Sequence, residues 1–211
     1  MAFDYKKEYK EFYAPKGVPH VVHVPAMNFV AVRGMGDPNE EEGEYKKAME
    51  LLYGVAYTLK MSPKAGYHME GYFEYVVPPL EGFWWQEGVQ GVDYSAKSSF
   101  QWISCIRLPD FVTKEDFDWA KETAAKKKKM DVSRVEFLSL EEGLVVQMMH
   151  QGPYDDEPGS VALMDKYLEE NGYVNDFSDS RRHHEIYLSD ARKTEPSKLK
   201  TILRHPIRKK A

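Results

Sequence analysis

Arg-Arg-His-His-Glu-Ile-Tyr-Leu-Ser-Asp, residues 181–190, predicts a β-strand that ends in Ile-Tyr-Leu. A strand places alternate side chains on opposite faces, so one face carries His183, Glu185 and Tyr187. The other face carries His184, Ile186 and Leu188, and its apolar pair predicts contact with the core. The face with Glu185 is therefore expected to meet a groove or solvent.

Glu185 is the candidate functional acid. The chain has 4 Trp and 14 Tyr, so a groove walled by aromatic side chains is a reasonable expectation. A carboxyl group in an apolar wall resists ionisation, which suits it to general acid or base catalysis or to pairing with a cationic ligand. The alternative is a surface glutamate on a half-exposed strand.

Length and composition indicate a globular chain. Its 211 residues, with 42% apolar and 30% charged side chains, are enough for a sizeable core. No apolar run approaches the ~20 residues that a membrane helix needs, and the N-terminus lacks the apolar stretch of a signal peptide. We therefore expect a cytoplasmic protein with no membrane partner. The net charge of −5 argues against a nucleic-acid partner, and lysines 126–129 fall at the end of a predicted helix, where cations are favoured.

Neither a metal site nor a cofactor site is expected. Cys105 is the single cysteine, and its apolar surroundings predict a buried small residue. The adjacent histidines 183 and 184 diverge on a strand, and the pair His20 and His23 is expected in a turn. No Gly-rich phosphate loop stands out.

The first half of the chain begins with an appendage, residues 1–20, predicted as a short amphipathic helix and a turn. Pro25 is expected to divide an edge piece from a true strand at 28–33. Residues 44–61 have the spacing of a core-facing helix, with the acids 40–42 before it. Three further strands are predicted, at 71–77, 80–85 and 100–108.

The second half repeats this order after a linking helix, which begins at a capping sequence in 113–116 and ends near 128. Strands at 135–140 and 144–150 are expected to form a hairpin around Glu-Glu-Gly. A helix at 154–171 follows, and then strands at 182–188 and 199–207.

This order, β-α-β-β in both halves, predicts the fold class. We expect an α+β protein of two pseudo-symmetric strand-helix-strand-strand modules, of the SHS2 type, that join into one antiparallel sheet. The helices would pack on one face, and a ligand groove would form between the modules. Module one is placed at about 21–110, the linking helix at 113–129 and module two at about 134–208, all within one domain, 21–208.

Aromatic side chains mark the candidate groove. Tyr53 and Tyr57 lie at i, i+4 spacing on a flank of the 44–61 helix, where they either edge a groove or belong to a deeply buried helix. Trp84 and Trp85 must face opposite ways on a strand, so one of them faces the groove or solvent. The loop 87–98 follows directly and is a candidate lid.

Several separated runs resemble the stand-alone GyrI-like small-molecule-binding proteins: Tyr-Gly-Val-Ala-Tyr-Thr-Leu-Lys-Met (53–61), Pro-Leu-Glu-Gly-Phe-Trp-Trp (79–85), Pro-Asp-Phe-Val-Thr (109–113), His-Gln-Gly-Pro-Tyr-Asp-Asp-Glu-Pro (150–158) and the 181–190 stretch. The resemblance spans about residues 20–208. It implies two strand-helix-strand-strand modules and an architecture shared with the effector domains of multidrug-sensing regulators. In those domains a late-strand acid and aromatic side chains hold hydrophobic, often cationic compounds, and Glu185 occupies the matching position.

The chain looks closer to a branch of this family that hydrolyses cyclopropanoid DNA-alkylating compounds. The resemblance then implies water attack with Glu185 as the general base, and a hydrophobic aromatic small molecule as the partner. Trp84 or Trp85, Trp102, Tyr53 and Tyr57 would form the stacking slot. Tyr187 would hydrogen-bond the substrate or orient Glu185, or else pack in the core.

Two other functions remain open. The chain could bind or sequester hydrophobic small molecules, cationic ones included, without chemistry, whereas detoxification is what hydrolysis of the alkylating compounds would achieve. It could also act on gyrase, although only the family name supports that; no protein partner is predicted.

Overall fold

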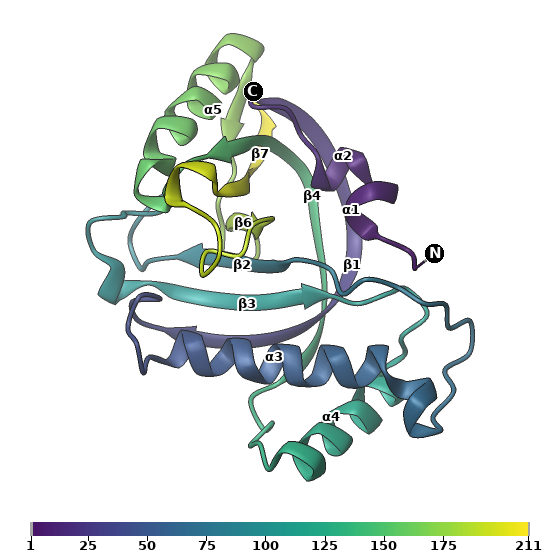
Figure 1. The fold of residues 1–211 in the computed structure, drawn as a ribbon. Coiled ribbons are helices and arrows are strands. Elements are labelled where there is room, and N and C mark those ends of the chain that lie inside the picture. The colour runs from purple at the N-terminus through teal and green to yellow at the C-terminus, as the bar shows by residue number, and fades with distance from the viewer. Residues whose placement is uncertain (1, 211) are drawn as a thin grey trace.

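The computed structural model describes residues 2–210 and shows an α+β protein built around a β-barrel (Figure 1). The elements follow one another as α1 (Tyr5–Glu8), α2 (Lys10–Tyr13), β1 (His20–Met35), α3 (Glu44–Lys60), β2 (Leu80–Trp85), β3 (Gln101–Arg107), α4 (Lys114–Lys128), β4 (Glu136–Gln151), α5 (Glu157–Asn171), β5 (Tyr173–Asn175), β6 (His183–Tyr187) and β7 (Lys200–Lys209). The first half runs β1-α3-β2-β3, and the second runs β4-α5-β5-β6-β7, with one strand more than the predicted repeat.

The strands pair only in antiparallel fashion, in the order β4-β1-β3-β2-β6-β7, and a further pairing of β4 with β7 closes the ring. The short β5 adds to β7 outside the ring. The expected sheet is thus antiparallel, but it is wrapped into a six-stranded barrel. The two 16-residue strands, β1 and β4, close the barrel. They pair with each other, and in addition β1 pairs with β3 and β4 pairs with β7.

Two predicted breaks in these long strands are wrong. Pro25 does not divide β1, because the same register with β4 continues from Val24–Gly143 to Ala26–Glu141. The Glu-Glu-Gly sequence likewise stays inside β4 and makes no hairpin. Gly143 has a φ of 65°, which a glycine adopts without strain, so the strand passes through it. Pairing with a long partner strand overrides these local turn signals.

The predicted strand at 71–77 is also wrong. Within it, Tyr75 makes only an isolated bridge to Phe3, whose backbone exchanges hydrogen bonds with Glu74 and Val76. This segment therefore pairs with the N-terminus and not with the barrel. Its place in the barrel is taken by β2, which was predicted at 80–85.

Three long helices lie outside the barrel. The helix α3 packs along β1 and β3, α4 packs on α3, and α5 lies at the other end against β4 and β5 (Figure 1). A capping box between Thr113 and Asp116 starts α4 where the sequence predicted it. In α3, Leu52, Val55 and Leu59 are fully buried. No helix within residues 2–210 has the length and apolar content needed to cross a bilayer.

The N-terminal segment, expected as an appendage, packs on the barrel. Tyr5, Phe12 and Tyr13 are buried in the same apolar cluster as the inward side chains of the strands. The Phe12 carbonyl accepts a hydrogen bond from Arg204 at 2.7 Å. The segment therefore covers one mouth of the barrel.

The barrel interior also holds a polar cluster, in which Glu81, His184 and Arg204 are buried and the Glu142 side chain is 10% exposed. His184 lies 3.0 Å from Glu81 and 2.9 Å from Glu142, and Arg204 lies 2.8 Å from Glu142. Burial opposes ionisation of Glu142, but the charges and hydrogen bonds of His184 and Arg204 lower its pKa to about 2. Because the charges are paired, removing one partner would leave the others buried and uncompensated.

Candidate functional site

Glu185 lies on the outer face of the barrel, on β6, together with His183 and Tyr187. The prediction that these three share a face, with Ile186 in the core on the other, is confirmed. The carboxylate accepts hydrogen bonds from His183 Nε2 at 2.9 Å and from the Tyr187 hydroxyl at 2.6 Å. The Tyr187 oxygen in turn accepts one from Trp84 Nε1 at 2.9 Å. Glu185 is only 7% exposed, so it is not a surface glutamate.

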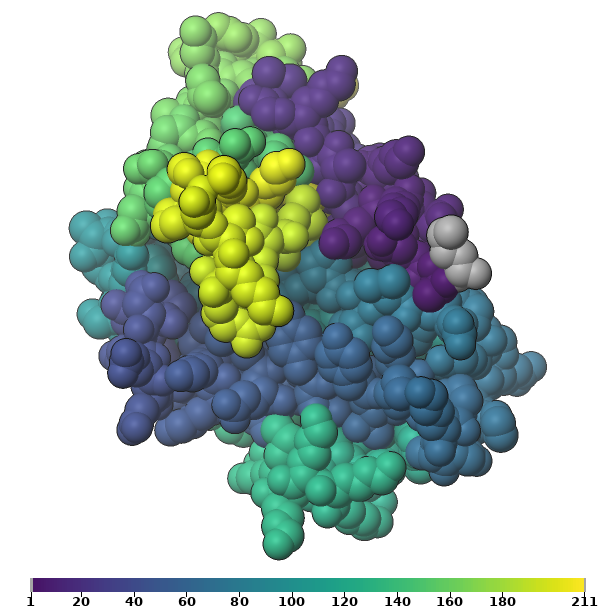
Figure 2. All heavy atoms as spheres, viewed as in Figure 1, coloured from purple at the N-terminus to yellow at the C-terminus, as the bar shows by residue number. Residues whose placement is uncertain are grey.

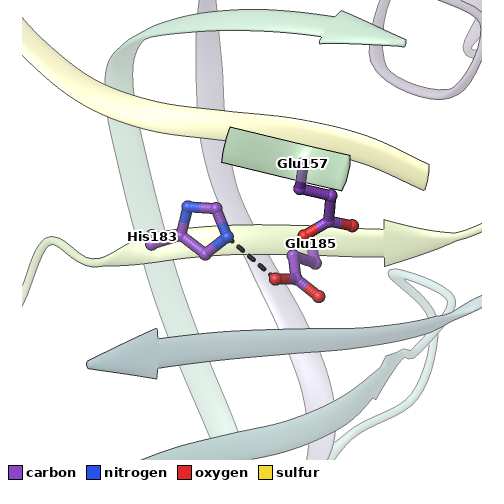
Figure 3. Close-up of side chains that lie close together, drawn as sticks. All are labelled: Glu157, His183 and Glu185. Carbon is purple, nitrogen blue, oxygen red and sulfur yellow. Dashed lines mark hydrogen bonds and ion pairs between the residues drawn. The ribbon is translucent and has the colours of Figure 1, made fainter. Parts of the chain in front are cut away.

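A second carboxyl group, from Glu157 at the start of α5, meets Glu185 across the site (Figure 3). Glu157 is fully buried, and its Oε2 accepts a hydrogen bond from the Tyr94 hydroxyl at 3.1 Å. The helix and the strand thus bring together two acids that are 28 residues apart in sequence. Two buried carboxyl groups in contact favour sharing one proton between them.

The surroundings push the pKa values of the two acids in opposite directions. Burial would raise the pKa of Glu185, but hydrogen bonds from His183, Tyr187 and Glu157 hold it below its ordinary value. Burial and the adjacent charge of Glu185 raise the pKa of Glu157 well above its ordinary value. The expectation that Glu185 resists ionisation is therefore wrong, because its hydrogen-bond donors outweigh burial; the acid that stays protonated is Glu157. The site offers a carboxylate base beside a carboxylic acid.

His205 on β7 extends the site behind His183. Its Nε2 lies 2.7 Å from His183 Nδ1. Which of the two rings donates this hydrogen bond depends on their tautomers. In either case the histidine pair orients the ring that lies against Glu185.

The same three residues could also hold a cation. Glu157, His183 and Glu185 each offer one ligand atom, and these atoms lie within 4.8 Å of one another. Carboxylate and imidazole ligands suit several divalent metals. A divalent ion and the shared proton are alternative ways to neutralise the facing carboxyl groups.

A cavity of about 340 Å³ adjoins the site. Trp84 and His183, both in contact with the Glu185 network, are among its lining residues, together with Trp85, Phe177, Arg182 and the start of the 87–98 loop. Its volume lies at the lower end of the range for small-molecule pockets. Glu185 and Glu157 are not among its lining residues, so the cavity meets their network only at Trp84 and His183.

The 87–98 loop lies over this region and is attached at several points. Gln86, at its base, accepts a hydrogen bond from Asp93 N and donates to the carbonyls of Asp93 and Ala96. Tyr94 reaches Glu157, and Lys97 pairs with Asp155 at 2.5 Å. From another side, the segment after β6 lies beside α3 (Figure 2). Entry of a large ligand to the carboxyl pair requires one of these segments to move.

The aromatic side chains that the sequence proposed for the groove do not all lie at the site. Trp84 faces the Glu185 network, whereas Trp85 lies on the opposite face of β2, where it stacks under the Arg182 guanidinium at 3.5 Å. Both tryptophans are among the residues that line the cavity. Trp102 is fully buried behind the site, with its ring against Tyr45 and Gly34.

Tyr53 and Tyr57 lie on the exposed flank of α3, 36% and 46% exposed, and neither lines the cavity beside Trp84 and His183. The structure thus gathers Glu185, Tyr187 and Trp84 around one point and leaves these tyrosines outside it.

Sequence reasoning missed Glu157, Tyr94 and His205. Glu157 stands in Asp-Asp-Glu-Pro, which is typical of a helix start, and Tyr94 stands in a polar loop. His205 alternates with Leu203 and Ile207 on an apolar strand face, which predicts a core position. Local pattern carries no signal for any of them, because their partners come from distant segments.

An α+β barrel with a buried carboxyl pair and a cavity nearby is compatible with a small-molecule-binding protein. The family described as the GyrI-like small molecule binding domain matches residues 18–208, and the chain belongs to this family.

Solved structures agree. A protein from Listeria innocua described as a hydrolase is 49% identical, with a TM-score of 0.88, over 98% of this chain and 100% of that one. An uncharacterized conserved protein from the same organism is 51% identical, with a TM-score of 0.91 over the same shares.

The EcmrR C-terminal domain is 13% identical, with a TM-score of 0.54 over 90% of this chain and 97% of that one, and shares the fold. No match was found among curated protein sequences.

Proposed function

We propose that this protein hydrolyses hydrophobic aromatic small molecules that carry an electrophilic strained ring, of the cyclopropanoid DNA-alkylating class. The observation that carries the proposal is the contact of Glu185, held ionised, with Glu157, held protonated. A base and an acid side by side can activate water and protonate the oxygen on which negative charge develops. The hydrolase description of the Listeria innocua relative supports the reaction class.

In this mechanism Glu185 removes a proton from water while the water oxygen bonds to the cyclopropane methylene carbon. The carbon–carbon bond of the ring breaks, and its electron pair moves into the dienone to give a phenolate oxygen. Glu157 protonates that oxygen. Glu185 now holds the proton from water, and because the two carboxyl groups touch, this proton passes to Glu157 and restores the starting state.

Three neighbours support these steps. His183 lies within hydrogen-bond distance of one oxygen of the Glu185 carboxylate, and Tyr187 donates a hydrogen bond to the other. The orientation of the carboxylate is therefore set before substrate arrives. Trp84 offers an aromatic surface at the cavity wall for a planar drug. Trp102 supports this wall through Tyr45, which contacts both tryptophans. Tyr53 and Tyr57 remain candidate contacts for a ligand that displaces the segment after β6 from its place beside α3.

The test is incubation of the purified protein with a cyclopropanoid drug, followed by chromatography of the ring-opened product. We expect product formation well above the buffer rate. Hydrolysis at the buffer rate would contradict the proposal.

A second candidate function is binding without reaction, since Glu185 is also placed to neutralise a cationic ligand. The fold shared with the EcmrR C-terminal domain is compatible with either function. Tight binding of lipophilic cations that is lost in Glu185→Gln, with no turnover of a cyclopropanoid drug, would favour binding alone.

A further inference from the structure

One imidazole and two carboxyl groups converge between α5 and β6 (Figure 3). Glu157 and His183 are fully buried, and Glu185 is 7% exposed. One ligand atom from each residue lies within 4.8 Å of the other two. In a tetrahedral zinc site the ligand atoms lie ~3.4 Å apart, so two side chains at the widest separation would each move by only ~0.7 Å.

One oxygen of this group is buried and has no hydrogen-bond partner. It is Oε1 of Glu157, whose other oxygen accepts a hydrogen bond from the Tyr94 hydroxyl at 3.1 Å. The Glu157 side chain is directed at Glu185, so the unpartnered oxygen belongs to the group that faces the second acid (Figure 3). Since buried polar atoms in native proteins are nearly all paired, this oxygen indicates that something further binds here.

A tyrosine hydroxyl orients each carboxyl group. Tyr187 donates to Glu185 Oε2 at 2.6 Å, and Tyr94 donates to Glu157 Oε2. Neither Oε1 is occupied by a tyrosine. Carboxylates that bind a metal ion are commonly held in this way by hydrogen bonds from outside the ligand set.

His183 also has the outer partner that a metal-binding histidine needs. Its Nε2 faces Glu185 at 2.9 Å, and its Nδ1 lies 2.7 Å from His205 Nε2. An ion on Nε2 would place the ring proton on Nδ1, which then donates to His205. The contact between the histidines is therefore compatible with metal binding whichever tautomer the metal-free ring adopts.

Charge and ligand type point to a divalent transition metal. Within residues 2–210, His183 is the one ion-pair partner of the two acids, so two buried carboxylates would be neutralised by one divalent ion. One nitrogen and two oxygen ligands suit Zn²⁺, whereas Ca²⁺ and Mg²⁺ need about six oxygen ligands. The cavity lined by His183 offers a hydrated ion a path to the site.

We propose that Glu157, His183 and Glu185 form a zinc site, in which Zn²⁺ replaces the proton shared by the two acids and a water molecule takes the fourth position. The proposal goes beyond the proposed hydrolysis, which uses the metal-free pair, because a carboxylate bound to zinc is a weaker base. The site then has two states, and zinc binding is measured without any substrate.

The test begins with protein that a chelator has freed of metal, titrated with ZnCl₂ against a coloured zinc chelator. We expect one equivalent to bind with a Kd of ~1 μM or tighter. Free zinc at 100 times the Kd should raise the Tm by ~5–10 °C, and the same concentration of MgCl₂ should leave it unchanged. Co²⁺ in the site should give visible absorption bands that added Zn²⁺ abolishes.

Glu157→Gln and Glu185→Gln should each weaken zinc binding by more than ~100-fold, because each removes a charged ligand and even an outer partner contributes 10- to 100-fold. Asp156→Asn is the matched control. It removes an exposed acid beside Glu157 that is not part of the group, and it should leave zinc binding unchanged.

No bound zinc in the unsubstituted protein would overturn the proposal, and this result needs no variant to fold. Zinc bound equally well by Glu157→Gln and Glu185→Gln would also overturn it, since the ion would then lie on surface histidines. Hydrolysis is assayed separately on metal-free protein in chelator. Failure of zinc binding and failure of hydrolysis are therefore separate results.

Discussion

Replacing Glu185 with glutamine removes the base and preserves most of its contacts. The glutamine oxygen can still accept the hydrogen bond from His183, and its amide can donate to the Tyr187 oxygen. That oxygen already accepts from Trp84 and has a second lone pair. The substitution should therefore cost only about 1 kcal/mol of stability.

The loss of activity should be much larger. General-base catalysis typically contributes on the order of 10²- to 10⁴-fold, or about 3 to 5 kcal/mol of activation free energy. Affinity for a neutral planar drug should change by less than about tenfold, or ~1.4 kcal/mol, since glutamine has nearly the same shape. Chemistry would be lost while binding survives.

The assay measures single-turnover rate and Kd for a neutral cyclopropanoid drug, and Kd for a lipophilic cation, in both proteins. Slow turnover with unchanged drug binding in Glu185→Gln would support Glu185 as the general base. Strongly weakened cation binding with little change for the neutral drug fits a counter-charge. Unchanged turnover together with unchanged cation affinity would remove Glu185 from the site and refute the reasoning.

Four further predictions concern the carboxyl pair, the polar cluster inside the barrel and the 87–98 loop. The kcat/KM profile should be bell-shaped, because activity needs an ionised Glu185, lost at acid pH, and a protonated Glu157, lost at basic pH; a flat profile through the acid range would contradict the pairing. Glu142→Gln should lower the free energy of unfolding by about 3 kcal/mol at neutral pH in urea titrations, because Glu142 loses its pairing inside the barrel, whereas the exposed neighbour variant Glu141→Gln should stay within ~0.5 kcal/mol. Since the pKa of Glu142 is lowered from 4.5 to about 2, its contribution is present above pH 4.5 and should fade as the pH falls towards 2; an equal gap between the two variants at pH 2 and pH 7 would count against it. Shortening the 87–98 loop should alter ligand affinity and leave the Tm nearly unchanged, whereas a large drop in Tm would show that the loop is structural.

Much of the fold follows from sequence pattern. The helices at 44–60, 114–128 and 157–171 were predicted within a few residues, because each has its own apolar spacing or cap. The alternation around Glu185 also predicted which side chains share its face. These features depend on neighbours within a few positions, where local geometry decides the outcome.

The errors have a common cause. Pro25 and the Glu-Glu-Gly sequence are typical of a break or a turn, yet both lie within 16-residue strands that a partner strand holds extended. Residues 71–77 look like a strand but pair with Phe3 at the N-terminus. In each case a long-range partner outweighs a local preference.

The sequence by itself determined the element order, the faces of the Glu185 strand and the acid at its centre. Only the tertiary structure decided that the sheet closes into a barrel and that Glu157 meets Glu185 with His205 behind His183. It also decided which acid is ionised, because a pKa in a buried site depends on donors and charges from segments distant in sequence. Periodicity records which side of a strand a residue faces, but not which residue faces it from across the fold.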